Sequence, residues 1–140
     1  MTSWQLYAFG SAVFAALTAI LGKIGIAGVP PDLGTFIRTI VVVIMAGAIA
    51  ASFGQFSALA LISAKSWIFL CLSGLATGAS WLLYYRALQL GPASQVAPID
   101  KLSVVLVAIF GVIFLGENLS WTHWGGIALI AAGVLILTLK

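Results

Sequence analysis

Long apolar runs separated by short polar or proline-containing breaks are the main pattern of this chain. A helix needs about 20 mostly apolar residues to cross the hydrocarbon core of a bilayer. Spans of a membrane β-barrel are instead about 9–11 residues long and alternate in polarity, which these runs do not. The pattern therefore predicts an all-α integral membrane bundle of five transmembrane helices, at about 4–26, 33–53, 67–90, 93–115 and 121–139.

The breaks contain residues that end or begin helices. Two prolines in the stretch Gly28–Asp32 separate the first two runs, because proline disfavours helical geometry in the residue before it. Between the last two runs, Gly116 favours a C-cap and Ser120 an N-cap. The longest break, about Gly54–Ser66, contains the apolar residues 56–62, which can lie along the membrane interface.

Composition supports a membrane protein and excludes several other classes. Only 6% of the residues are charged and 63% are hydrophobic, whereas soluble domains contain about 25% charged residues. The net charge of +3 comes without any basic run, so we expect membrane lipid and not nucleic acid as a partner. With one histidine, one cysteine and three carboxylates, no catalytic or metal-ligand spacing can be assembled. We expect no cofactor, no metal and no enzymatic activity.

Aromatic and basic residues predict how the helices are threaded. Four tryptophans, at positions 4, 67, 121 and 124, stand at helix starts on the side of the N-terminus, as an interfacial belt would. An odd number of helices places the termini on opposite sides. Lys and Arg residues number five on the C-terminal side, Lys140 included, and one on the other, Lys65. The positive-inside rule then favours an N-out, C-in, multi-pass protein of the cell (inner) membrane.

The adjacent residues Asp100 and Lys101 stand inside the fourth apolar run. An ionisable group at membrane depth costs about 2.5–3.5 kcal/mol on insertion scales. Consecutive helical residues point about 100° apart, so we expect the two not to face each other and each to need its own partner or water. Ser103 shares a helix face with Asp100 and can donate a hydrogen bond to it.

Other basic residues in the same half of the bilayer are candidate partners for Asp100: Lys23, Arg38 and Arg86. Arg38 is expected roughly one turn inside the second helix, and Arg86 as an anchor at the membrane edge. Two interpretations stay open. Either the charges form a structural ion-pair cluster, with Lys101 reaching the headgroups, or they line a substrate or ion pathway.

Two backbone features bear on packing and helix shape. Pro98 either bends the fourth helix, by removing a backbone hydrogen bond, or stands harmlessly in the first turn of a helix that begins later. Gly74 and Gly78, four residues apart, can let a second helix approach closely. That helix can belong to the same chain or to a second copy.

Several segments together resemble the EamA-like domain of the drug/metabolite transporter superfamily. They are Tyr84–Leu88, Gly91–Ser94, Val96–Ser103 and Phe114–Glu117. The resemblance covers essentially the whole chain, as one EamA-like domain over residues 1–140. It is greatest to the short bacterial and archaeal branch with a single five-helix domain. Lys23, Arg38, Asp100 and Lys101 match recurrent positions of that family.

The resemblance implies half of a ten-helix inverted-repeat transporter. It implies a small-molecule permease, usually an exporter of metabolites or drugs, that acts as a homodimer or with a second five-helix half. Proton coupling through Asp100 is a further expectation. The charge bias argues against insertion in both directions, and a parallel dimer would not reproduce the inverted arrangement, so the form of pairing stays open. The alternative is a non-transporting membrane subunit whose intramembrane charges are structural.

Overall fold

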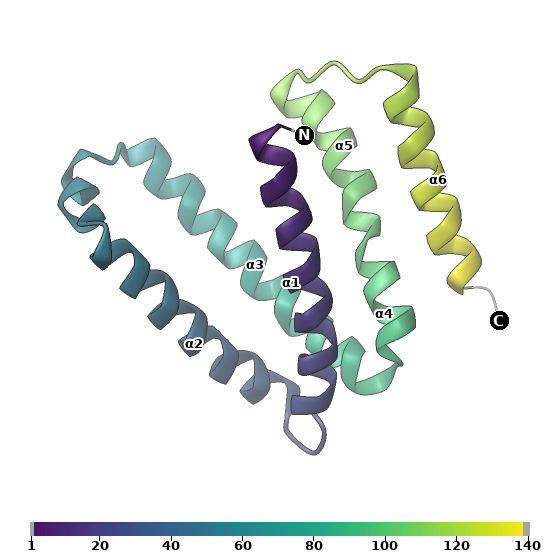
Figure 1. The fold of residues 1–140 in the computed structure, drawn as a ribbon, viewed down its shortest axis with the longest axis horizontal. Helices are drawn as coiled ribbons and strands as arrows, with labels where there is room; N and C mark the ends of the chain where they lie inside the picture. The colour runs from purple at the N-terminus through teal and green to yellow at the C-terminus, as the bar shows by residue number, and fades with distance from the viewer. Residues whose placement is uncertain (1, 139–140) are drawn as a thin grey trace. The chain divides into compact units, whose positions relative to one another are not determined.

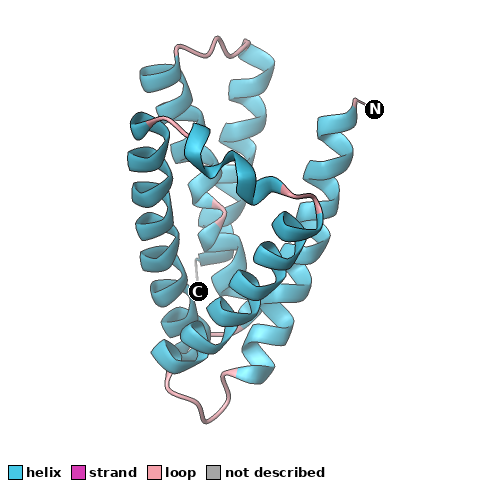
Figure 2. Ribbon diagram, turned by 90° about the vertical axis from the view of Figure 1, so that its left-hand side faces the viewer, coloured by secondary structure: helices cyan, strands magenta, loops and turns pink. Residues whose placement is uncertain are grey.

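The computed structural model describes residues 2–138, and every regular element in that range is helical (Figures 1 and 2). The elements are α1 (Ser3–Gly25), α2 (Pro31–Ser52), the 3-10 helix η1 (Gln55–Leu61), α3 (Ala64–Leu90), α4 (Ala93–Asp100), α5 (Leu102–Leu115) and α6 (Trp121–Thr138). Five stretches of helix are long and apolar enough to cross a membrane, with α4 and α5 together forming one of them. The predicted all-helical, five-span architecture is confirmed.

The helix limits agree with the sequence prediction to within a few residues. α2 begins at Pro31, two residues earlier than expected, with the proline in the first turn where its missing N–H is harmless. α3 begins at Ala64 instead of Trp67. The predicted end of the last helix at Leu139, and the charge of Lys140, lie outside the described residues.

The connection between the last two spans has the capping chemistry that its sequence predicts. Gly116 takes a left-handed conformation with φ of 68°, and the N–H of Glu117 donates to the carbonyl of Gly111 at 3.1 Å. The N–H of Gly116 donates to the same carbonyl, so the left-handed glycine folds the chain back onto the last turn of α5 and caps it. Ser120 accepts a hydrogen bond on its Oγ from the N–H of His123 at 3.3 Å, as an N-cap residue does.

The chain divides into two compact units, each described here by itself. The first unit combines the first twenty residues with the segment from Gly91 onward, and the second is Leu21–Leu90. In the second unit, α2 and α3 pack as an antiparallel hairpin with η1 at the turn (Figure 1). In the first unit, α6 packs against both α4 and α5.

The buried residues of the second unit gather where α2 begins and α3 ends. Leu88 is fully buried, and Ile26, Thr35 and Tyr85 are nearly so. Gly22 has no side chain and so leaves room for the Tyr85 ring to pack against α1. A Cβ on Gly22 would lie only 3.1 Å from the Tyr85 hydroxyl oxygen. This packing holds the ends of the helices together on the side where the basic residues stand.

Most other large apolar side chains are exposed. Leu75, Leu83 and Leu129 are each at least 66% accessible. A soluble protein could not expose so much apolar surface, whereas helices in a bilayer turn such side chains to lipid. The surface therefore agrees with the composition: this is a multi-pass membrane protein.

Candidate functional site

Three basic residues of the second unit lie at the end of the α2–α3 hairpin, and we call Lys23, Arg38 and Arg86 the basic cluster. Each lies on or contacts the segment Trp81–Leu88 of α3. Asp32 is the only carboxylate in residues 21–90. The cluster and Asp32 together carry an excess of two positive charges, so this end of the unit favours anions.

Arg38 lies over two aromatic rings of α3. Its guanidinium carbon is 4.1 Å from the ring centroid of Trp81 and 5.5 Å from that of Tyr85. A cation over an aromatic face gains about 0.5–2 kcal/mol, the larger values applying when water is excluded. Arg38 and Trp81 are both half-buried. The rings therefore stabilise a positive charge within a membrane-spanning helix.

Arg38 also lies farther from the start of α2 than the sequence indicated. It is seven residues from the start of α2 at Pro31, which is about two helical turns, or about 10 Å along the axis. α2 begins two residues before the predicted start, so Arg38 is about half a turn farther along the helix than the predicted limits gave.

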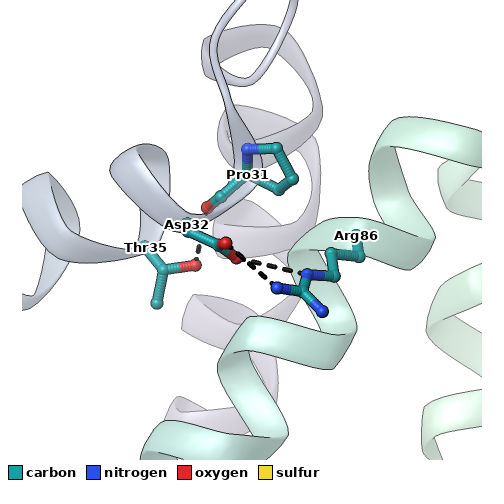
Figure 3. A network of polar contacts seen from close by, with 4 residues as sticks. All are labelled: Pro31, Asp32, Thr35 and Arg86. Atoms are coloured by element: carbon teal, nitrogen blue, oxygen red, sulfur yellow. Dashed lines mark hydrogen bonds and ion pairs between the residues drawn. The ribbon is translucent and has the colours of Figure 1, made fainter.

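Arg86 forms a bidentate ion pair with Asp32, drawn in Figure 3. Its Nε donates to Oδ1 at 3.2 Å and its Nη2 to Oδ2 at 3.0 Å. Both side chains are more than half exposed, so the pair stands at the edge of the hairpin. Arg86 therefore neutralises the one carboxylate of its unit, and its expected role as an edge anchor stays a prediction.

Hydrogen bonds to backbone carbonyls tie the same end of the unit together. Lys23 donates from Nζ to the carbonyl of Leu88, and Gln89 donates to the carbonyl of Val29 at 3.2 Å. The buried Thr35 hydroxyl donates to the carbonyl of Pro31 at 2.9 Å (Figure 3). Lys23 thus satisfies a carbonyl in the last turn of α3, which lacks an intrahelical partner, and Gln89 ties α3 to the loop before α2.

Asp100 and Lys101 belong to the first unit and contact each other. The Lys101 ammonium lies 3.4 Å from Oδ2 of Asp100. The expectation that these neighbours do not face each other was therefore wrong. It assumed a continuous helix, whereas the helix is interrupted at Lys101, whose long side chain reaches back to the carboxylate. Within α4 and α5, Asp100 contacts Lys101 and not Ser103, which is exposed.

The predicted fourth helix is two helices joined at Lys101. α4 ends at Asp100 and α5 begins at Leu102, and Pro98 lies inside α4 near its end. Around the joint the N–H of Lys101 donates to the carbonyl of Pro98, and the N–H of Val104 to that of Lys101, both at 3.0 Å. These are the shorter i to i+3 bonds of a 3-10 turn. The charged pair thus stands where the helix is interrupted.

The predicted site residues therefore fall into two groups. Lys23 and Arg38 belong to residues 21–90, and Pro98, Asp100, Lys101 and Ser103 to the other unit. Trp81 and Tyr85 were not expected from the sequence as partners of Arg38. Their spacing of four residues, which places both on one helix face, was the available signal. Among residues 2–138, no three His, Cys, Asp or Glu side chains lie together as they would around a metal ion.

Comparison with known proteins decides the family. The model of the EamA-like transporter family matches residues 2–139. The chain belongs to the EamA-like transporter family. The resemblance seen in short segments of the sequence is thereby confirmed. Membership of this family makes the chain a membrane transporter protein.

Two kinds of relative are informative. An uncharacterized transporter in the cobO 3' region of Sinorhizobium sp is 56% identical over 135 residues, covering 96% of each chain. A probable 4-amino-4-deoxy-L-arabinose-phosphoundecaprenol flippase subunit, ArnE, of Hamiltonella defensa is 33% identical over 73 residues. That match covers 52% of this chain and 66% of the relative. ArnE of Yersinia pestis is 33% identical over 69 residues, 60% of its length. No solved structure matches this EamA-like chain.

Proposed function

We propose that this EamA-like protein exports a small amphipathic metabolite or drug across the inner membrane, as one half of a paired transporter. The observation that carries the proposal is Arg38, a cation about two turns inside a membrane span and held there by aromatic rings. Ionisable residues at such depth mark substrate and ion pathways in transporters. Family membership and the transporter named among the relatives support transport over catalysis.

Pairing follows from the size of the chain. Five spans are half of an inverted-repeat transporter, in which the substrate site lies between two repeats. The ArnE relatives carry the word subunit in their names, which supports pairing with a second five-helix half. A homodimer and a heteromeric partner both satisfy this requirement. Gly74 and Gly78 are proposed as the face for the second helix.

Asp100 is the proposed proton carrier. It is partly exposed, it stands where the fourth span is interrupted, and its contact with Lys101 is a single long one of 3.4 Å. A carboxylate at an interrupted helix can bind and release a proton while backbone carbonyls beside it are open to a cavity. Lys101 is proposed as the residue that holds the carboxylate in place. The N-out, C-in orientation would place this end of the spans at the cytoplasmic side.

Reconstitution in proteoliposomes tests the proposal. Purified protein is assayed for movement of fluorescent or radiolabelled amphipathic cations, neutral solutes and anions, the last included because the ArnE name contains a phosphate-linked lipid sugar. With an imposed pH gradient, the wild type should accumulate a solute and Asp100→Asn should lose the dependence on the gradient. Asp32→Asn, which removes a carboxylate at the hairpin edge, is the matched control and should retain it.

A non-transporting subunit is the alternative, favoured by the ion pair Arg86–Asp32 and the carbonyl contact of Lys23, which tie helix ends together. If no solute moves with the protein alone but transport appears with a second five-helix protein, the proposal of a paired transporter is supported. If neither preparation transports and Asp100→Asn has no effect in any assay, the non-transporting subunit is the better interpretation.

A further inference from the structure

We infer that Arg38 and Trp81 form a binding subsite for a phosphate monoester that carries an apolar chain. The inference rests on the proposed function, because it names the substrate class of the same site. Four properties of the second unit support it: the unused donors of Arg38, the position of its guanidinium along α3, the apolar surface beside it and the local charge.

The first property is that the guanidinium of Arg38 has donors to offer. It carries five N–H groups in a planar fork. Within residues 21–90, all of which the structure describes, its contacts are the faces of Trp81 and Tyr85, and no carbonyl or carboxylate accepts from it. Both oxygens of Asp32, the one carboxylate of this unit, accept from Arg86. A ring face stabilises the charge but leaves the in-plane donors for a ligand.

The second property is the position of the guanidinium along α3. It lies nearer to Trp81, at 4.1 Å, than to Tyr85, at 5.5 Å. Trp81 precedes Tyr85 by four residues, so it is about 6 Å farther from the end of α3 at Leu90. The cation therefore lies beside the ring that is farther from the end of the hairpin.

The third property is the character of the wall beside the cation. Trp81 is half-buried, so part of its indole remains accessible beside the guanidinium. Val41, three residues after Arg38 and on the same side of α2, is an exposed apolar residue. A ligand whose anionic group binds Arg38 would thus have an aromatic and aliphatic surface for the rest of its length. That combination selects an amphipath over a simple inorganic anion.

The fourth property is charge, which favours a phosphate monoester over a carboxylate. The basic cluster and Asp32 carry an excess of two positive charges. A phosphate monoester carries about −1.5 to −2 at neutral pH and three acceptor oxygens, whereas a carboxylate carries a single charge. Arginine binds phosphate with two parallel hydrogen bonds. The charge of Lys23, near the end of α3, adds to the attraction.

Calorimetric titration tests the inference on the full chain. Protein in phosphatidylcholine nanodiscs is titrated with hexyl phosphate, and heats from empty nanodiscs are subtracted. Hexyl phosphate should bind saturably, and inorganic phosphate and hexanoate should each bind about tenfold more weakly, because one lacks the apolar chain and the other the second charge. Hexanol should show no saturable binding. Equal binding of hexanol and hexyl phosphate would overturn the inference.

Variants locate the site. Arg38→Gln should weaken hexyl phosphate binding about tenfold or more, and Arg38→Lys should restore only part of it, because an ammonium lacks the planar fork. Trp81→Leu should weaken binding several-fold. Lys65→Gln removes one positive charge near the start of α3 and should bind as the wild type does. Helical circular dichroism and gel filtration confirm that each variant is folded. Wild-type affinity in folded Arg38→Gln, or an equal loss in Lys65→Gln, would refute a site at Arg38.

The ligand can be a membrane lipid or a soluble ester, and a competition arm separates these sources. Nanodiscs that contain some phosphatidic acid, whose headgroup is a phosphate monoester, are titrated in the same way. Loss of hexyl phosphate binding assigns the subsite to lipid-borne phosphate, and unchanged binding assigns it to a soluble ester. Both outcomes support the subsite if Arg38→Gln abolishes the effect. If the wild type binds hexyl phosphate saturably but moves no solute, the transport proposal fails and the subsite stands. If the protein transports but its binding does not depend on Arg38, the subsite fails and the transport proposal stands.

Discussion

The guanidinium of Arg38 lies 4.1 Å from the ring centroid of Trp81, between two helices that are mostly apolar. Their residues are 43 positions apart in the chain. The contact links α2 to α3 by something more specific than aliphatic packing, and it places a positive charge well inside a membrane span. Stability, charge pairing and close packing around this hairpin can each be tested.

The Arg38–Trp81 contact should appear as an energetic coupling. In a double-mutant cycle with Arg38→Gln and Trp81→Leu, we expect a coupling free energy of about 0.5–2 kcal/mol, the range of a cation over an aromatic face. The measurement is reversible unfolding in mixed micelles, followed by helical circular dichroism. Strictly additive effects of the two substitutions would show that the ring does not stabilise the cation.

The Arg86–Asp32 pair should contribute little and should depend on salt. Both side chains are more than half exposed, so solvent and ions screen their attraction. Asp32→Asn and Arg86→Gln should each lower the melting temperature slightly at low salt, and the double variant should be no worse than either. At high salt the three should melt together with the wild type. A large loss that persists at high salt would indicate a buried, structural pair instead.

Gly22 should be far less tolerant of a side chain than Gly74. A Cβ at Gly22 would lie 3.1 Å from the Tyr85 hydroxyl oxygen, whereas one at Gly74 meets nothing within 4 Å. We expect Gly22→Ala to lower the free energy of unfolding by about 1–3 kcal/mol, as overpacking does. Gly74→Ala should be neutral, or stabilising by up to about 1 kcal/mol, because alanine favours helix.

Removal of the Tyr85 hydroxyl supplies the internal check on that prediction. Tyr85→Phe should relieve part of the Gly22→Ala defect, since the nearest atom to the added methyl group is the hydroxyl oxygen. If Gly22→Ala is as stable as Gly74→Ala, the close approach of α1 to Tyr85 is not a constraint on the fold.

Gly74 and Gly78 should matter for pairing and not for the fold of the hairpin. Apart from the neighbouring backbone of α3 itself, no atom lies within 4 Å of a Cβ on either glycine, so larger side chains fit within this unit. Gly74→Leu and Gly78→Leu should leave the helical signal and melting temperature unchanged while reducing cross-linked dimer in proteoliposomes. Gly47→Leu is the control, because Gly47 lies on α2, the other helix of the hairpin, and a Cβ there also meets nothing within 4 Å. Undiminished dimer in both variants would exclude this face.

The sequence by itself determined the class of protein, the number of spans and most of their limits. Runs of about 20 apolar residues can only be satisfied in a bilayer as helices, because every backbone N–H and C=O must be paired within the segment. Local chemistry also placed the caps at Gly116 and Ser120, since capping depends on residues adjacent in the chain.

The partners of the charged residues were decided by the tertiary structure. Helices that are apolar on most faces carry little periodic signal to say which face meets which helix. The spacing of Trp81 and Tyr85 places both rings on one face, but the sequence does not say that this face meets Arg38, or that Asp32 meets Arg86. The contact of Asp100 with Lys101 depended on a helix interruption that a continuous apolar run conceals. The sequence therefore specified which residues were costly to bury, and packing between helices specified which groups stabilise them.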